Sequence, residues 1–296
     1  MIVIKYGGNA LPNTDSNDPV LEAIGDAFLD GEQIVLVHGG GPQIDKALKE
    51  KGIGGEKVAG YRVTDSQVFE VVQSVLSGTV LRSIVNYLIG SEVNAVGLSA
   101  SDGGLIRAKK FKPVIDGKSV DIGFVGQVDE TNPMILESLI TEGYLPVISP
   151  VAADQDGIGY NVNADLVAAA IAGALKADAA IFLTDVDGIY TTDPRIVPRA
   201  RKLERISYEE MLELASVGAK VLQTRSVELA MKQRVRVQVL SSFEDKPGSL
   251  VVDEDEIVEQ PVVSGIAYSR DDAKITLRRV PDRPGVAAAV FGALAK

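Results

Sequence analysis

The chain contains no cysteine and no tryptophan, and His38 is its only histidine. Without cysteine, disulfides, thiolate metal sites and cysteine nucleophiles are excluded. With one histidine, a metal site of several histidines cannot form, and a Ser-His-Asp triad could use only His38. We interpret His38 as a hydrogen-bonded residue at a strand end rather than as a general base.

Charge and hydropathy argue against two further classes of protein. The formal net charge of −11 would repel a phosphate backbone, and aromatic residues make up only 5% of the chain, which leaves few platforms for stacked bases. No apolar run reaches the roughly 18–20 residues that span a bilayer, and the first ten residues lack the layout of a signal peptide. The sequence predicts a cytoplasmic protein that binds neither nucleic acid nor membranes.

The order of the apolar segments predicts an α/β fold. With 296 residues, 46% of them hydrophobic, the chain can bury a substantial core. Strands are predicted at 2–6, 34–38, 94–99, 145–149, 179–184 and 235–240. Helices are predicted at 19–30, 42–51, 65–90, 132–142, 164–175, 207–215 and 219–232. Strands that are apolar on both faces and alternate with helices indicate a mainly parallel sheet in a three-layer αβα sandwich. The alternating segment 106–128 predicts an inserted β-hairpin.

Glycines follow the first two predicted strands. Gly7 and Gly8 come after the first strand, and the triplet at 39–41 comes after the second. Two strand–glycine–helix junctions would aim backbone N–H groups at one place, which suits a phosphate, and Lys5 precedes the first of them. The alternative is two tight turns that need glycine only for its backbone freedom. Neither G-x-x-x-x-G-K-[ST] nor G-x-G-x-x-G occurs in the chain, so a phosphate would be bound by a different fold.

Three polar groups are further candidates. In YNVNAD at 160–165, Asn161 could bind an acceptor and Asp165 could orient lysines, or the segment could only cap a helix. Arg62 could clamp a carboxylate, or it could form a surface salt bridge with Asp65. Lys220 is predicted in the first turn of a helix, where it opposes the helix dipole unless an anion compensates it.

A turn-rich segment after the strand at 179–184 could form a wall for a nucleotide base and ribose, or it could be an ordinary loop. Its candidate residues are Thr184, Asp185, Tyr190, Asp193 and Arg195. The convergent glycines and lysines suit phosphoryl transfer to a carboxylate, because that acceptor is ionised at pH 7 and needs no base. Such catalysis consists of positioning and charge neutralisation.

Taken together, these motifs resemble those of the amino acid kinase family. Up to about residue 190, KYGGNA, VHGGGPQI, GYRVTD, GLSASDGGLIRAK, DIGFVGQV and YNVNAD are similar to acetylglutamate kinases. From about 183, TDVDGIYTTDPR, SVGAKVL and SSFEDKPGSLV are similar to aspartate kinases, and the two resemblances overlap at LTDVDGIY. The chain therefore resembles a chimera. The tail at 273–296 resembles the first strand and helix of an aspartate-kinase ACT domain.

The resemblance implies a kinase domain at 1–258, with an acceptor lobe at about 1–175 and a nucleotide lobe at about 176–258, followed by a partial ACT-like segment at 259–296. It implies that Lys5, Gly7, Gly8 and Gly39 hold the ATP phosphates. Gly40, Gly41, Arg62 and Asn161 would bind the acceptor. Asp165 would organise Lys5 and Lys220, and Mg²⁺ would be bound through the nucleotide, with no metal site of the protein's own.

The expected reaction is ATP-dependent phosphorylation of the side-chain carboxylate of N-acetyl-L-glutamate. An aspartate kinase and a chimeric scaffold that binds ATP with weak or no catalysis are the alternatives. Asn9 and Ala10 stand where aspartate kinases have Thr-Ser, which makes aspartate the poorer candidate. The resemblance also implies a homodimer or higher homo-oligomer, assembled through the helix at 65–90.

Overall fold

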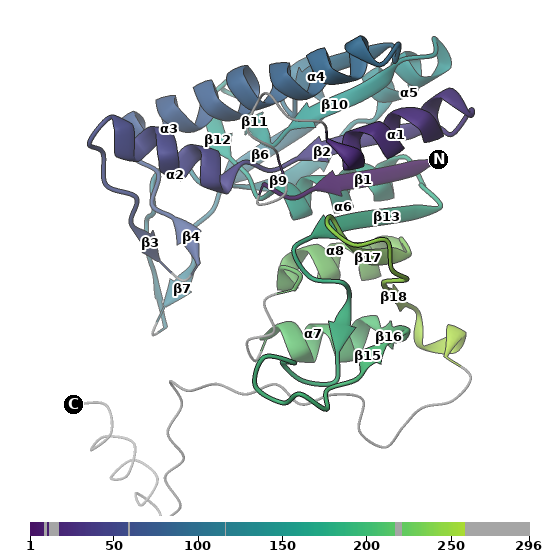
Figure 1. Ribbon diagram of the computed structural model, residues 1–296. Helices are drawn as coiled ribbons and strands as arrows, with labels where there is room; N and C mark the ends of the chain where they lie inside the picture. Colours follow the sequence, from purple (N-terminus) through teal and green to yellow (C-terminus); the bar gives the residue numbers. More distant parts are fainter. Residues whose placement is uncertain (9–10, 12–17, 59, 116, 217–220, 258–296) are drawn as a thin grey trace, which may run out of the picture.

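The computed structural model describes residues 1–8, 11, 18–58, 60–115, 117–216 and 221–257 (Figure 1). Its centre is an eight-stranded sheet in the order β16-β18-β17-β13-β1-β2-β10-β5. The strands are β1 (Ile2–Tyr6), β2 (Ile34–His38), β5 (Ala95–Ser99), β10 (Leu145–Ser149), β13 (Ala179–Thr184), β16 (Arg205–Ser207), β17 (Val237–Ser241) and β18 (Ser249–Val252). The sheet is parallel from β5 to β17, and β18 pairs antiparallel with β17. The predicted α/β class with a mainly parallel sheet is confirmed.

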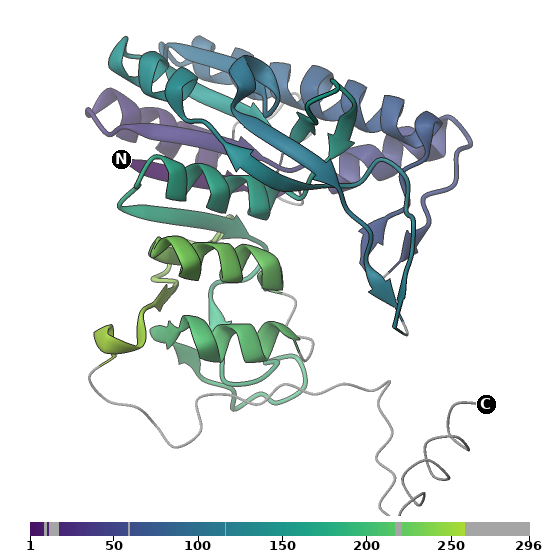
Figure 2. The ribbon, with the colours of Figure 1, turned by 180° about the vertical axis from the view of Figure 1, so that it is seen from behind.

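Helices cover both faces of this sheet because its central strands are apolar on both sides. One face carries α1 (Pro19–Leu29), α2 (Gly41–Glu50), α3 (Ser66–Gln73) and α4 (Leu81–Gly90), which share a core with Ile4 and Leu36. The other face carries α5 (Met134–Thr141), α6 (Ala164–Ala174), α7 (Tyr208–Ser216) and α8 (Thr224–Gln233), packed against Val3 and Val35. Figures 1 and 2 show these two layers from opposite sides.

A second, smaller sheet extends the layer that contains α5 and α6. It has the order β12-β11-β6-β9, and its strands are β6 (Ile106–Lys110), β9 (Gly126–Thr131), β11 (Val151–Ala153) and β12 (Gly159–Asn161). Because β6 and β9 pair antiparallel, the predicted hairpin at 106–128 is confirmed. Smaller pairs are β3 (Lys57–Val58) with β4 (Tyr61–Arg62), β7 (Val114–Ile115) with β8 (Lys118–Ser119), and β14 (Ile189–Tyr190) with β15 (Lys202–Leu203). Short 3₁₀ turns are η2 (Asp102–Gly104) and η3 (Glu254–Glu256).

The helix predicted at 65–90 is continuous but contains a π-helical segment, η1 (Ser74–Val80), between α3 and α4. Although no uninterrupted apolar run is long enough to span a bilayer, the whole helix, Ser66–Gly90, has the length and mean hydropathy to do so. Half of its most apolar window is buried inside the molecule, where Val72, Leu76 and Leu88 pack in the core. The burial indicates a core helix.

One predicted helix starts in the wrong place. A helix was expected from 219, but residues 221–223 adopt no helical structure and α8 begins at Thr224. Lys220 itself lies outside the described residues, as does the ACT-like segment at 259–296.

Candidate active site

The two glycine loops contact each other at the carboxyl ends of β1 and β2. These strands pair in register, with Tyr6 opposite His38, so both loops begin at the same edge of the sheet. A Cβ placed on Gly8 would lie 2.7 Å from the Gly40 nitrogen and 2.9 Å from the Gly41 nitrogen. Only glycine permits this approach of backbone to backbone, so the glycines have a packing requirement beyond turn geometry.

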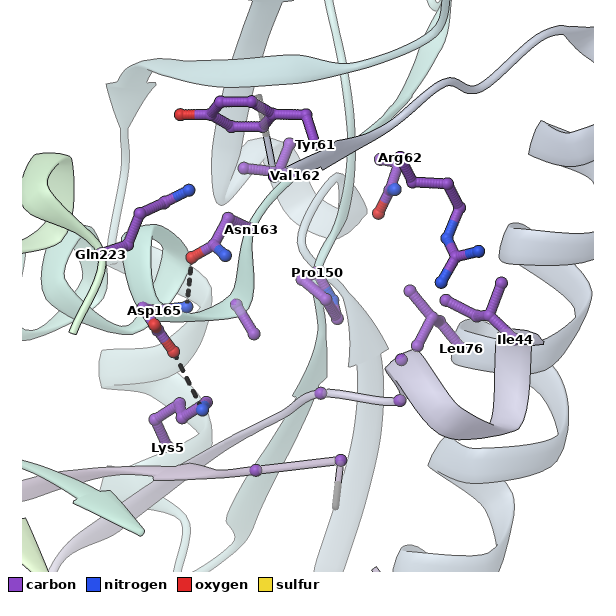
Figure 3. A pocket seen from close by; sticks show the side chains of 18 of the residues that line it. Lys5, Ile44, Tyr61, Arg62, Leu76, Pro150, Val162, Asn163, Asp165 and Gln223 are labelled. Atoms are coloured by element: carbon purple, nitrogen blue, oxygen red, sulfur yellow. Dashed lines mark hydrogen bonds and ion pairs between the residues drawn. The ribbon is translucent and has the colours of Figure 1, made fainter. Parts of the chain in front are cut away.

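The loops form one wall of a cavity of about 420 Å³ (Figure 3). The lining comes from both halves of the chain. Its members are Lys5, Gly7, Gly8, Gly39, Gly40, Gly41, Pro42, Ile44, Lys57, Gly60, Tyr61, Arg62, Leu76, Val125, Pro150, Asn161, Val162, Asn163, Ala164, Asp165, Thr184, Asp185, Val221 and Gln223.

Helix α2 starts at this cavity without a side-chain cap. Its N-cap is Gly40, which has no side chain, and Pro42 in its first turn has no N–H. The first N–H groups of a helix have no partner within the helix, and the helix dipole adds partial positive charge there. This end of α2 can therefore accept an anion such as a phosphate.

An ion pair occupies another side of the cavity. The Lys5 ammonium in β1 lies 3.0 Å from Asp165 Oδ1 in the first turn of α6, and the two side chains are only 14% and 16% exposed. Asn163 caps α6 by accepting hydrogen bonds from the N–H groups of Asp165 and Leu166. The segment at 160–165 therefore does cap a helix, through Asn163, while the Asp165 carboxylate pairs with Lys5 (Figure 3).

Arg62 lies on β4 across the cavity from Lys5 (Figure 3). Its side chain is 7% exposed, and its guanidinium lies 2.5 Å from Asp45 Oδ1 on α2, without hydrogen-bond geometry. The salt bridge considered with Asp65 does not form, since Asp65 caps α3 by accepting from the Val68 N–H. Burial raises the pKa of the Asp45 carboxyl, but Arg62 and Lys57 outweigh it, and the pKa falls below its ordinary value.

Asn161 ends β12 and lines the same cavity. Its backbone N–H donates to the Phe124 carbonyl at 2.9 Å, so the segment before β9 fixes its position. Lys5, Asp165, Arg62, Asn161 and the glycines thus converge on one space, although they come from positions up to 160 residues apart in the chain.

Comparison with known proteins identifies the family. The sequence pattern named "Amino acid kinase family" matches residues 1–241. The chain belongs to this family. An acetylglutamate kinase from Methanopyrus kandleri is 39% identical over 250 residues, which cover 82% of this chain and 96% of the relative.

This kinase also has relatives of a second kind. An aspartate kinase from Pseudomonas putida is 36% identical over 300 residues, covering 99% of this chain and 68% of the relative. Among solved structures, N-acetylglutamate synthase from Neisseria gonorrhoeae, in complex with coenzyme A and N-acetylglutamate, superimposes with a TM-score of 0.71 at 25% identity, covering 86% of this chain and 59% of that one. The hybrid resemblance inferred from the motifs is confirmed.

The expected nucleotide wall lies only partly on the cavity. Thr184 and Asp185 line it, whereas Tyr190, Asp193 and Arg195 do not. The Tyr190 hydroxyl donates to Asp187, and Arg195 donates to both carboxylate oxygens of Asp193. The nucleotide-binding role of these residues stays a prediction, as does that of Lys220.

Several lining residues were not identified from the sequence. Lys57 lies in β3 and Tyr61 in β4, and Gln223 follows Lys220 by three residues in the sequence. Their closeness to predicted site residues in the sequence was an available signal. No sequence signal indicated Leu76, which reaches the cavity from the π-helical segment. One of its methyl groups would lie 2.6 Å from a Cβ placed on Gly40.

His38 is fully buried at the end of β2, and its Nδ1 lies 2.8 Å from the Gly39 carbonyl oxygen, so this nitrogen carries the proton and donates. Burial lowers the pKa of the imidazole to about 4. His38 is therefore neutral at pH 7, and it does not line the cavity. Its interpretation as a hydrogen-bonded strand-end residue is confirmed.

Proposed function

We propose that this kinase transfers the γ-phosphoryl group of ATP to the side-chain carboxylate of N-acetyl-L-glutamate. The ionised carboxylate oxygen attacks phosphorus, the bond to the β–γ bridging oxygen breaks, and an acyl phosphate and ADP result. The observation that carries the proposal is the convergence of Lys5–Asp165, the uncapped end of α2 and Arg62 on one cavity. The position of the chain's one histidine agrees with a reaction that moves no proton.

Each group has a role that follows from its charge. Lys5, together with Lys220, neutralises the negative charge that develops on the transferring phosphoryl group, and Asp165 keeps Lys5 oriented. N–H groups of the glycine loops bind phosphate oxygens, with Gly7, Gly8 and Gly39 toward ATP. Gly40 and Gly41 lie toward the acceptor.

Arg62 and Asn161 bind the acceptor. Arg62 is buried, and its planar guanidinium can form a bidentate pair with a carboxylate. Asp45 Oδ1 lies 2.5 Å from the Arg62 Nη1 nitrogen, and the Asp45 side chain is itself 48% exposed. An acceptor carboxylate can therefore approach the guanidinium from the cavity while Asp45 keeps the side chain in place.

The nucleotide binds on the side of Thr184 and Asp185, with Tyr190, Asp193 and Arg195 completing the site. Among the residues that the structure describes, no group of three or more histidine, aspartate or glutamate side chains could hold a metal ion. Mg²⁺, which the family implies, would be bound through the phosphate oxygens of the nucleotide.

N-acetylglutamate is favoured as the acceptor by two observations. The match to an acetylglutamate kinase covers 96% of that relative, and Asn9 and Ala10 depart from the Thr-Ser of aspartate kinases. The experiment incubates the protein with ATP, MgCl₂ and hydroxylamine, which traps an acyl phosphate as its coloured hydroxamate. We expect a higher kcat/KM with N-acetylglutamate than with aspartate.

Aspartate kinase is the second candidate, because the match to an aspartate kinase reaches 99% of the chain. A higher kcat/KM with aspartate in the same assay would establish it and refute our choice of acceptor. Binding of a non-hydrolysable ATP analogue in a calorimeter, without hydroxamate from either acceptor, would indicate instead a scaffold that binds ATP.

Assembly, location and domain organisation complete the proposal. We propose a cytoplasmic homodimer or higher homo-oligomer that uses the helix at 66–90, whose Ile89 is 54% exposed. We also propose a kinase domain at 1–258 followed by a partial ACT-like segment at 259–296. Light scattering measures the oligomeric state directly.

A further inference from the structure

Arg225 joins the C-terminal half of the fold to the second sheet. It lies in the first turn of α8, and its Nη1 donates to Gln127 Oε1 in β9 at 2.8 Å. Its guanidinium carbon lies 3.9 Å from the centre of the Phe111 ring, just after β6. A cation in the first turn opposes the helix dipole, so contacts outside the helix must favour this position. The amide and the aromatic ring provide such contacts.

The Phe111 side of this contact leads to the acceptor site. The Phe111 ring centre lies 4.8 Å from that of Tyr61, which lines the cavity beside Arg62. Arg225, Phe111 and Tyr61 therefore form one continuous chain of contacts from α8 to β4, the strand that carries the proposed carboxylate clamp.

The backbone around Phe111 leads to the other acceptor residue. The Phe111 N–H donates to the Val125 carbonyl at 2.8 Å, and the Asn161 N–H donates to the neighbouring Phe124 carbonyl at 2.9 Å. The segment that Arg225 touches thus contacts both β4 and β12. A shift of this segment would move Arg62 and Asn161 together.

The α8 side of the contact leads to the nucleotide site. Gln223 is the N-cap of α8 and lines the cavity together with Val221. Val221 directly follows Lys220, the proposed second lysine, and Gln223 is three residues after it in the sequence. The first turn of α8 therefore determines where Val221 and Gln223 meet the cavity.

We propose that Arg225 is a positioning residue that fixes the nucleotide side of the cavity against the acceptor side during phosphoryl transfer. This inference rests on the proposed function. In-line transfer needs the acceptor oxygen and the γ-phosphorus in near-attack geometry, and a misplacement of about 1 Å can cost about 100-fold in rate. Arg225 touches no reacting atom and acts through the placement of the residues that do.

The test compares Arg225→Ala with Arg225→Lys and with the control Lys232→Ala. Lys232 is exposed in the last turn of the same helix, so its replacement removes an equal charge without touching the second sheet. We expect Arg225→Ala to lower kcat by about 10- to 100-fold. Calorimetric affinity for a non-hydrolysable ATP analogue should change little, because the nucleotide contacts remain. Arg225→Lys should recover part of kcat, since an ammonium can still lie over Phe111 but lacks the planar fork.

A second variant separates positioning from folding. Phe111→Leu keeps an apolar side chain but removes the aromatic face, and it should reproduce part of the loss in kcat. All rates are measured well below the thermal midpoint of each variant. Equal kcat in Arg225→Ala and Lys232→Ala would overturn the proposal, as would a loss that disappears when Arg225→Ala is assayed at lower temperature.

The two proposals fail in different ways. If the unmodified protein forms no hydroxamate, the proposed function fails before any variant is compared. If the unmodified protein is active and the Arg225 variants match the control, the function stands and the positioning role is wrong.

Discussion

Lys5 and Asp165 have two roles that substitution can separate. As a largely buried ion pair they stabilise the junction between β1 and α6, and as a site they present an ammonium to the cavity. Removing one partner of a buried pair leaves the other charge uncompensated and costs stability, whatever its catalytic role. Activity and stability therefore have to be measured on the same variants.

We expect Lys5→Ala to lower kcat by about 100- to 1000-fold, with a smaller change in KM, because the ammonium acts on charge that develops in the transition state. The double variant Lys5→Ala with Asp165→Asn should regain thermal stability, since no unpaired charge is left, but should not regain kcat. Lys49→Ala, on the exposed end of α2, is the control for loss of one positive charge. An unchanged kcat in Lys5→Ala would refute the role of this lysine.

At this scale the sequence could identify residue types better than partners. Lys5, Arg62, Asn161 and Asp165 were predicted from local motifs, and all four line the cavity. The pairing of Arg62 with Asp45 could not be predicted, because α2 and β4 meet only in the folded chain.

The glycine loops show how one element depends on another. The loop after β1 and the loop after β2 come within contact distance only because both positions lack a Cβ. The sequence showed two glycine clusters and indicated a phosphate site, but it could not show that the two loops also pack on each other.

Gly8→Ala tests this contact. The new Cβ would lie 2.7 Å from the Gly40 nitrogen and 2.9 Å from the Gly40 Cα, so backbone must move. We expect a loss of about 1–3 kcal/mol in the free energy of unfolding and about 100-fold in kcat. Gly54→Ala is the matched control, because its Cβ would meet nothing within 4 Å. Equal unfolding curves and rates for the two variants would show that the loops can separate freely.

Among whole elements, the central strands of the sheet were predicted more exactly than the start of α8. The strands 2–6, 34–38, 145–149 and 179–184 have the predicted bounds, because short apolar runs between polar segments mark a buried strand. The start of α8 was placed five residues too early, since Ala, Val and Leu at 219–222 are as compatible with a helix as with the irregular segment at 221–223. The π-helical segment at 74–80 has no sequence signal that we recognise.

At the scale of the molecule, the cavity lies where the two parts of the hybrid meet. Its lining runs from Lys5 to Gln223 and so draws on both resemblances. Such an arrangement requires the sheet to be continuous across the junction, and β13 meets this requirement by pairing with β1 on one side and β17 on the other. The local motifs predicted the two parts, whereas their fit depends on tertiary contacts such as that of Arg225.

The same central sheet gives the whole fold a predicted dependence on pH. Burial lowers the pKa of His38 to about 4, whereas an unfolded histidine has a pKa of about 6.5. Between these values the unfolded chain binds more protons than the folded one, so this group destabilises the fold as the pH falls. The stability that the neutral imidazole contributes is complete above about pH 6.5. As the pH falls toward 4, the free energy of unfolding decreases by up to about 3 kcal/mol through this group.

His38→Gln removes this titration while keeping an N–H that can donate to the Gly39 carbonyl. Urea unfolding at pH 7.5 and at pH 4.5 measures the effect for both proteins. We expect the protein with His38 to lose more free energy of unfolding than His38→Gln between these two pH values, because its carboxylates titrate equally in both and only the imidazole differs. The kcat at pH 7.5 should be similar in the two proteins, since the histidine lies outside the cavity lining. Equal losses of stability would contradict the prediction, because they would mean that the pKa of His38 is the same in the folded and in the unfolded chain.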